Sequence, residues 1–293
     1  MKLHFWFSSV QHFHKTPTLL KLTSASIVVA YYVLAIILVE DYYHINFKPN
    51  PTIFSLMGLV LGLLLVFRTN TAYDRWWEGR RMLGELTNQT RALAMKLNAF
   101  LPNEDYENRH YFATMIGNYG IAMKEHLRKG VKFEELEMDD HHELEVLQKS
   151  IHVPNKIASL IYMKINNLYK NKKFTEEQFL VIDRQMTVFT DVVGACERIK
   201  NTPIPFAYTI HLKKFIFFYI LILPFALIYD LHYWSIILMV IIFYAFTGLE
   251  VIGEEIEDPF GKDMNDLPTD SISINIKKNI FDILLTFPQL QKP

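Results

Sequence analysis

The sequence predicts an all-α membrane protein with four transmembrane helices and a cytosolic helical region. The chain of 293 residues is 51% hydrophobic, and its apolar residues gather in four blocks, at residues 22–39, 51–67, 215–229 and 233–249. Two polar regions, residues 68–214 and a C-terminal tail at 250–293, contain apolar residues that recur every three or four positions, as on amphipathic helices. No alternating run indicates a sheet.

The first two blocks are each long enough for one membrane span. Residues 51–67 carry no charge and form, at about 1.5 Å per residue, a helix of about 25 Å, close to the about 30 Å of a hydrocarbon core. Asn50 before Pro51 is typical of an N-cap followed by proline at the first helical position. Since no proline occurs between Thr52 and Phe100, one helix can leave the bilayer and continue in water.

The last two blocks predict a helical hairpin that turns at residues 230–232. Both blocks are short, but short spans are tolerated when flanking side chains reach the interface. Arginines follow the second block, at positions 68, 75, 80 and 81, whereas the loop before it holds one lysine and two acids. The positive-inside rule therefore places both termini and the polar regions in the cytoplasm.

Several helices are expected in the polar regions, over about residues 104–129, 142–151 and 155–169. Thr175 and Gln178 form a capping box that begins another helix. A last amphipathic helix is indicated by the spacing of Ile276, Ile280, Ile283 and Phe287.

Composition and motifs exclude several classes of protein. The formal net charge of −1 argues against a nucleic-acid partner. The single cysteine, Cys196, cannot form an intrachain disulfide, and an inert packed thiol is its expected role. The sequence contains no GxSxG, HExxH, Walker or dinucleotide motif, so we expect neither an enzyme nor a cofactor.

One face of the second block carries Leu59, Leu63 and Phe67, which are spaced by four. Such a face most often meets lipid or another helix. Alternatively, copies of this helix surround an axis, and rings of leucine and phenylalanine form a constriction that gates by dewetting. The same face extended past the membrane carries Asp74 and Glu78, either as acidic rings of a vestibule or as a solvated surface.

Two acidic stretches are candidates for metal binding. Residues 139–143 hold two aspartates, two histidines and a glutamate, but adjacent histidines do not share a helical face, and a solvated loop is the commoner role. Residues 254–266 place clustered carboxylates around a turn, which suits a hard cation such as calcium. Their spacing is not that of a 12-residue helix-loop-helix site.

Three motifs resemble those of the bestrophin family in its bacterial branch: FRTNTAYDRWWEGR at 67–80, CERIKNTPIPFAY at 196–208 and GEEIEDPFGKDMNDLP at 253–268. With the four spans, the resemblance covers residues 1–293 as a single unit. It implies a homopentameric ion channel of the bacterial inner membrane, assembled from copies of itself in the lipid bilayer around one central pore for monovalent ions. The second span would line this pore, with its neck at Leu59, Leu63 and Phe67.

The resemblance also implies a second, cytosolic constriction on the helix before the second motif, at Phe179, Leu180 or Ile182. Calcium-activated members bind calcium through an acidic run after the Pro-Phe-Gly turn. Here only Asp263 and Asp266 match that run, so a weak calcium site is the most that the match supports.

The sequence leaves two alternatives for the ion selectivity of such a channel. Leucine rings lack the positive ring edge that phenylalanine presents to an anion, and acidic rings at Asp74 and Glu78 would attract cations, which favours a cation-permeable channel. A chloride channel of the same fold is the alternative. A membrane-anchored scaffold without a pore is the alternative from another class, and an enzyme using residues 139–143 comes third.

Overall fold

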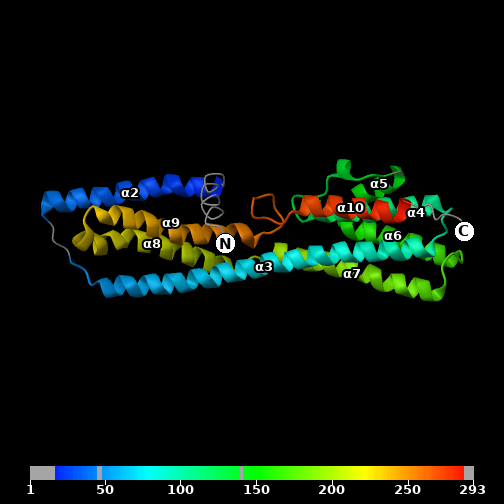
Figure 1. Cartoon of the computed structure of the whole chain (residues 1–293), viewed down its shortest axis with the longest axis horizontal. Coiled ribbons are helices and arrows are strands. Elements are labelled where there is room, and N and C mark those ends of the chain that lie inside the picture. The colour runs from blue at the N-terminus through cyan, green and yellow to red at the C-terminus, as the bar shows by residue number, and fades with distance from the viewer. Residues whose placement is uncertain (1–16, 45–47, 139–140, 287–293) are drawn as a thin grey trace, which may run out of the picture. The chain divides into compact units, whose positions relative to one another are not determined.

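The computed structural model describes residues 17–44, 48–138 and 141–286, and every regular element among them is helical. The all-α prediction is therefore confirmed. In chain order the elements are α2 (Pro17–Tyr43), α3 (Pro51–Phe100), α4 (Tyr106–His126), the short 3-10 helix η2 (Phe133–Glu135), α5 (His141–Gln148), α6 (Val153–Lys170), α7 (Glu176–Asn201), α8 (Phe206–Leu231), α9 (Trp234–Glu257) and α10 (Thr269–Leu285) (Figure 1).

The chain divides into two compact units. The membrane unit comprises Met1–Arg75, Pro203–Glu257 and Asp263–Asn265, and the second unit comprises Trp76–Thr202, Asp258–Lys262 and Asp266–Pro293. These compact units divide near Arg75, a few residues beyond the polar boundary at Arg68 that the sequence predicts. The expectation that residues 1–293 form a single bestrophin-type unit stays a prediction.

Four helices in the described part of the chain are long and apolar enough to cross a membrane: Leu22–Tyr43, Pro51–Phe100, Phe206–Leu231 and Trp234–Glu257. Each covers one of the four apolar blocks, except for Tyr233 at the start of the last block, and extends beyond its end. Helix α3 is the longest, with 50 residues, and it runs without a break from its apolar beginning into its charged part. The expectation of one continuous helix through this boundary is confirmed.

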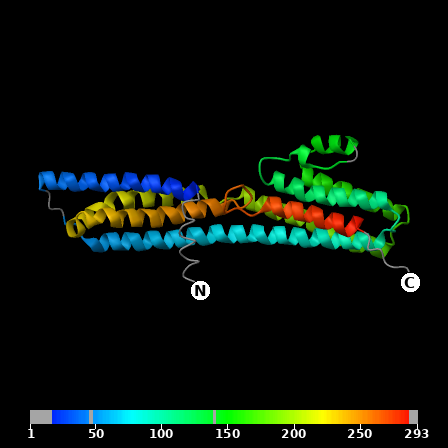
Figure 2. The same cartoon turned by 45° about the horizontal axis from the view of Figure 1, so that its top comes forward.

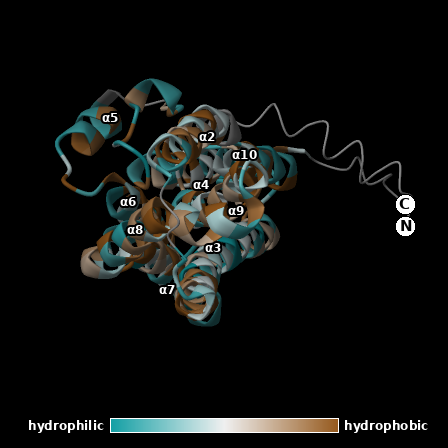
Figure 3. Ribbon diagram, turned by 90° about the vertical axis from the view of Figure 1, so that its left-hand side faces the viewer, coloured by the Kyte–Doolittle hydropathy of each residue, from teal (hydrophilic) through white to brown (hydrophobic). Residues whose placement is uncertain are grey.

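The membrane unit packs its four helices around one apolar core, in which α9 lies against both α2 and α8 (Figures 1 and 2). Buried side chains come from every helix and include Val33, Ile37, Leu61, Leu65, Tyr219, Ile220 and Met239. The Tyr32 hydroxyl donates to the Leu221 carbonyl at 2.7 Å, which satisfies a polar group in an apolar setting. Figure 3 shows hydrophobic stretches of the ribbon around α2 and α9.

Local sequence signals fix the ends of these helices. The Asn50 side-chain oxygen accepts from the Thr52 amide at 3.0 Å, which confirms the N-cap before Pro51. Helix α8 ends at Leu231 and α9 begins at Trp234, with His232 at a positive φ of 45° between them. The hairpin predicted at residues 230–232 is therefore present.

The second unit is built around α4, which packs against α10 and α6, while α6 packs against α7. The core-facing side chains of α10 are Ile276, Ile280 and Leu284. Thr175 and Gln178 form the expected capping box at the start of α7. The helices expected near residues 104–129, 142–151 and 155–169 correspond to α4, α5 and α6, whereas Phe287 lies outside the described residues.

Candidate functional site

An apolar face of α3 is left uncovered by the described part of the chain. Leu59, Leu63 and Phe67 are 70%, 56% and 57% exposed, whereas Leu61 and Leu65 are buried in the core of the membrane unit. Successive helical residues turn by about 100°, so these two groups occupy opposite sides of the helix. Because Leu61 and Leu65 pack in the core, Leu59, Leu63 and Phe67 point away from the core of their own chain.

The three sequence motifs meet at Glu257, the last residue of α9. Its carboxylate accepts from Arg68 Nη2 at 2.5 Å and from the Ile204 amide at 2.6 Å, and its main-chain oxygen accepts from Arg75 Nε at 3.1 Å. The Arg68 side chain is fully buried, and removing one partner of a buried ion pair costs about 3–5 kcal/mol. Glu257 thereby fixes the rotation of α3 where its apolar part ends.

The charged residues beyond this point are mixed in sign. Asp74 is exposed, but the Glu78 carboxylate accepts from Arg198 at 3.2 Å, a partner that the sequence did not indicate. Arg81 is also exposed, and it follows Leu63 by 18 residues, about five turns of the same helix. The face that carries the leucines therefore carries a basic residue as well as acidic ones.

The three candidates for a cytosolic constriction lie in different environments on α7. Ile182 is fully buried in the core of the second unit, and the Phe179 ring stacks on Tyr169 with centroids 4.8 Å apart. Leu180 is 52% exposed. Of the three, Leu180 is the side chain that α7 leaves most exposed.

The Pro-Phe-Gly turn is tied to α3 by close packing within the second unit. The Phe260 ring is fully buried, and a Cβ atom placed on Gly79 would lie 3.1 Å from its nearest carbon. Gly79 belongs to the first motif and Phe260 to the third. A side chain at position 79 would press against this buried ring, so glycine favours the close packing of the turn on α3.

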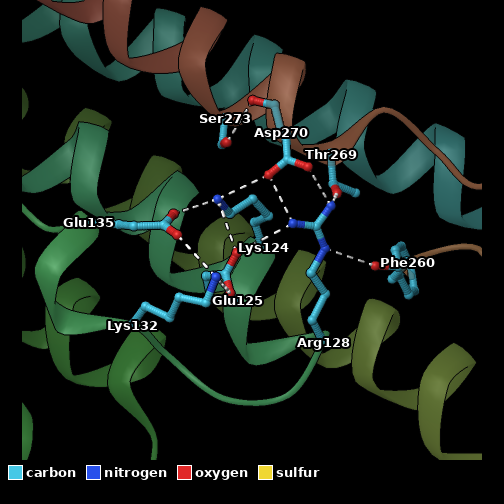
Figure 4. A network of polar contacts seen from close by, with 9 residues as sticks. All are labelled: Lys124, Glu125, Arg128, Lys132, Glu135, Phe260, Thr269, Asp270 and Ser273. Atoms are coloured by element: carbon cyan, nitrogen blue, oxygen red, sulfur yellow. Dashed lines mark hydrogen bonds and ion pairs between the residues drawn. The ribbon is translucent and has the colours of Figure 1, made fainter. Parts of the chain in front are cut away.

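A polar network holds the segment after this turn on α4 (Figure 4). The Arg128 guanidinium donates to both Asp270 carboxylate oxygens, at 2.8 and 2.7 Å, and to the Phe260 carbonyl at 3.3 Å. Lys124 lies 3.1 Å from the same aspartate and 2.7 Å from Glu135. The start of α10 is thus bound by a bidentate ion pair, a strong and directional contact, to Arg128, which lies two residues beyond the end of α4.

The whole-chain comparison decides the family. Residues 2–282 match the family described as Bacterial/Fungal Bestrophin protein. The chain belongs to the bestrophin family. This bestrophin is 37% identical over 238 residues to a voltage-dependent anion channel-forming protein of Nostoc sp., covering 80% of this chain and 78% of that relative. It is 32% identical over 243 residues to a similarly named protein of Escherichia coli K12, covering 82% and 79%.

Solved structures agree with this membership. A variant of a bacterial bestrophin homolog from Klebsiella pneumoniae has a TM-score of 0.85 and 28% identity, covering 91% of this chain and 100% of that chain. Another crystal structure of that homolog gives a TM-score of 0.84 at 27% identity, covering 92% and 99%. Family and relatives place this bestrophin among membrane channel proteins rather than among enzymes.

The weak calcium site expected at Asp263 and Asp266 stays a prediction. Asp263 belongs to the membrane unit and Asp266 to the second unit, and the Asn265 side-chain amide donates to Glu255 at 2.6 Å. Calcium takes six to eight oxygen ligands, whereas Lys262 and Met264 supply none from their side chains. No step of the proposed function is therefore assigned to calcium.

A second group with metal-ligand composition was not indicated by the sequence. His126, His152 and Glu197 come from three elements of the second unit, and both histidine Nε2 atoms contact one Glu197 oxygen, at 2.6 and 2.8 Å. However, His152 Nδ1 accepts from the Asn155 amide at 3.2 Å, so the neutral ring carries its proton on Nε2. That nitrogen donates to Glu197 and has no lone pair for a metal, and the group is a hydrogen-bonded triad.

Two other sequence candidates are placed as follows. Asp139 and Asp140 of the 139–143 stretch lie outside the described residues. Cys196 is fully buried in the core of the second unit.

Proposed function

We propose that this bestrophin is a homopentameric channel that conducts monovalent anions through a central pore lined by α3. The observation that carries the proposal is the uncovered apolar face of Leu59, Leu63 and Phe67. In a ring of five α3 helices, these side chains would form three apolar rings. Such a neck excludes water and ions when it is narrow and conducts when it widens or wets.

Anions are favoured here over cations, in contrast to the preference drawn from the sequence. The relatives named as anion channel-forming proteins support this assignment. The charges of the chain also support it, because Arg198 pairs with Glu78 and because Arg81 shares the face of Leu63. The acidic vestibule expected at Asp74 and Glu78 therefore loses much of its attraction for cations.

The surroundings of the pore follow from the charges that flank the spans. Arginines after the second span and lysines before the third favour an inner-membrane protein with both termini in the cytoplasm. The second unit would then form a cytosolic vestibule. Its exposed Leu180 is the candidate for the second constriction.

The test is the reversal potential of the purified protein in a planar bilayer under asymmetric sodium chloride. We expect a current that reverses near the chloride potential, and a larger conductance for Leu63→Ala because the variant removes bulk from the neck. Ile241→Ala, an equally exposed apolar site on α9, is the control and should leave conductance unchanged.

Each outcome separates the alternatives. Reversal near the sodium potential would keep the channel and reject anion selectivity. Equal conductance of Leu63→Ala and the parent protein would reject this face as the pore lining. If neither the parent protein nor Leu63→Ala conducts a current, although both are confirmed pentamers, the membrane-anchored scaffold without a pore is favoured.

A further inference from the structure

The membrane unit contains a pocket of about 690 Å³ between α2, α8 and α9, three helices that lie side by side in Figures 1 and 2. Its walls are apolar over most of their area and include Val28, Ile216, Phe217, Ile220 and Phe243. A pocket of this size and lining suits part of a long hydrocarbon group.

One end of the pocket is charged. Lys213 on α8 and Glu250 and Glu254 on α9 line this end, whereas Leu221, about 12 Å further along α8, lines the apolar end. The pocket is therefore amphipathic along its length. A ligand that matches it must combine an apolar tail with a polar head.

Two buried oxygen atoms in the wall of the pocket accept no hydrogen bond from the described part of the chain, namely Thr247 Oγ1 and Glu250 Oε1, although the latter forms an ion pair with Lys213 at 3.5 Å. Glu250 is only 5% exposed. A buried acceptor without a donor costs about 1–3 kcal/mol, and more when it is charged. Both atoms would be satisfied by a ligand that brings N–H donors.

The charged end of the pocket favours a ligand that carries a cation. The Lys213 ammonium contacts both Glu254 oxygens, at 3.0 and 2.9 Å, and lies further away, at 3.5 Å, from the same Glu250 Oε1. One lysine thus faces two carboxylates, so a formal negative charge is left over. A purely anionic head group would be repelled.

We propose that this pocket binds a phospholipid whose head group carries a primary ammonium, such as phosphatidylethanolamine. Its ammonium donates to Glu250 and Thr247, its phosphate faces Lys213, and an acyl chain fills the apolar part between α2 and α8. A choline head group carries the same charge but has no N–H to donate, and a glycerol head group lacks the cation. The site therefore discriminates by hydrogen bonding as well as by charge.

The test is native mass spectrometry of the full-length protein in a mild detergent, with phosphatidylethanolamine, phosphatidylcholine or phosphatidylglycerol added at equal concentration. We expect phosphatidylethanolamine to be retained about tenfold better than either other lipid, the ratio that one charge-assisted hydrogen bond supplies. Glu250→Gln should remove this preference, and Thr247→Val should weaken it. Asp230→Asn, at the opposite end of α8 and outside the pocket, is the matched control.

A second variant keeps the proposal testable if Glu250→Gln fails to fold. Ala25→Trp fills the pocket from α2 and should reduce retention of all three lipids while leaving the thermal stability of the protein unchanged. Equal retention of the three lipids by the parent protein would overturn the proposal. So would an undiminished preference in folded Glu250→Gln, or the absence of bound lipid because a neighbouring subunit covers the pocket.

Discussion

Asp270 is the residue at which the second unit depends most clearly on pH. Its hydrogen bonds from Arg128 hold the pKa of the Asp270 carboxyl well below its ordinary value of 3.8, and Lys124 acts in the same direction. A depressed pKa means that the folded protein favours the charged form. The stabilisation is therefore complete above the ordinary value and is lost as the pH falls below it.

We predict that Asp270→Asn lowers the melting temperature of the protein between pH 5 and 7, and that the difference from the parent protein shrinks below about pH 4. The loss at neutral pH should be about 1 kcal/mol, because the side chain of Asp270 is 55% exposed and its ion pairs are screened by solvent. Thermal unfolding of both proteins in the same detergent across this pH range measures the effect. A difference that is constant down to pH 3 would show that the charge of Asp270 does not stabilise the fold.

Cys196 illustrates the opposite effect, in which burial suppresses reactivity. Desolvation, with smaller contributions from Glu78 and Glu197, raises the pKa of the Cys196 thiol to about 12. Because the thiolate is the nucleophile, we predict that the native protein does not react with a maleimide at pH 7.5 over an hour, and that the denatured protein reacts at once. Mass spectrometry of the labelled protein checks this. Stoichiometric labelling of the native protein would contradict the burial of Cys196.

At the scale of elements, two glycines on α3 allow a matched comparison. Glycine is less favourable than alanine in a helix by about 1 kcal/mol, so an alanine should stabilise α3 wherever space allows. At Gly84 the nearest atom is the flexible end of Arg80, at 3.4 Å, whereas at Gly79 it is the buried ring of Phe260, at 3.1 Å. The first neighbour can move away and the second cannot.

We predict that Gly84→Ala raises the melting temperature and that Gly79→Ala lowers it. The expected gain is up to about 1 kcal/mol for Gly84→Ala, and the expected net loss is about 1 kcal/mol for Gly79→Ala, in which overpacking outweighs propensity. Thermal unfolding of the two variants beside the parent protein is the measurement. A rise in both would mean that the Pro-Phe-Gly turn is not packed against α3 as the structure has it.

The sequence predicted the helices well because their signals are local. The Asn50 cap, the capping box from Thr175 to Gln178 and the turn at His232 each depend on residues close together in the chain. Apolar blocks predicted the spans but not their full length, since a helix continues through charged residues such as Arg68 when these find partners.

The sequence could not predict which residues far apart in the chain form pairs. Arg68 and Glu257 are 189 positions apart, and neither residue type shows that the two form a pair. The same holds for Arg198 beside Glu78, a pair that weakens the argument for cations. The neck at Leu59, Leu63 and Phe67 stays a prediction, because a single chain shows that the face is free but not what covers it.

At the scale of the whole molecule, the proposed pore requires that the face of Leu63 meets its own copies around a five-fold axis. Packed helices lie about 8–10 Å apart, so thiols placed on this face fall within reach of a short bifunctional maleimide. The chain suits this experiment because Cys196 is its only cysteine and is buried. A thiol introduced elsewhere is then the only reactive one.

We predict that Leu63→Cys, treated with a bis-maleimide in detergent, gives a covalent dimer of twice the 34.5 kDa of one chain. One chain in five should stay monomeric at complete reaction, because each thiol bonds one linker and a ring of five leaves one subunit unpaired. Leu61→Cys is the control on the opposite, buried side of α3, and it should remain monomeric on the same denaturing gel. Complete conversion to dimers would indicate a two-fold contact rather than a ring of five. Dimers from both variants would mean that α3 is not held in one rotation, and the buried pair of Arg68 and Glu257 would then not fix the pore face.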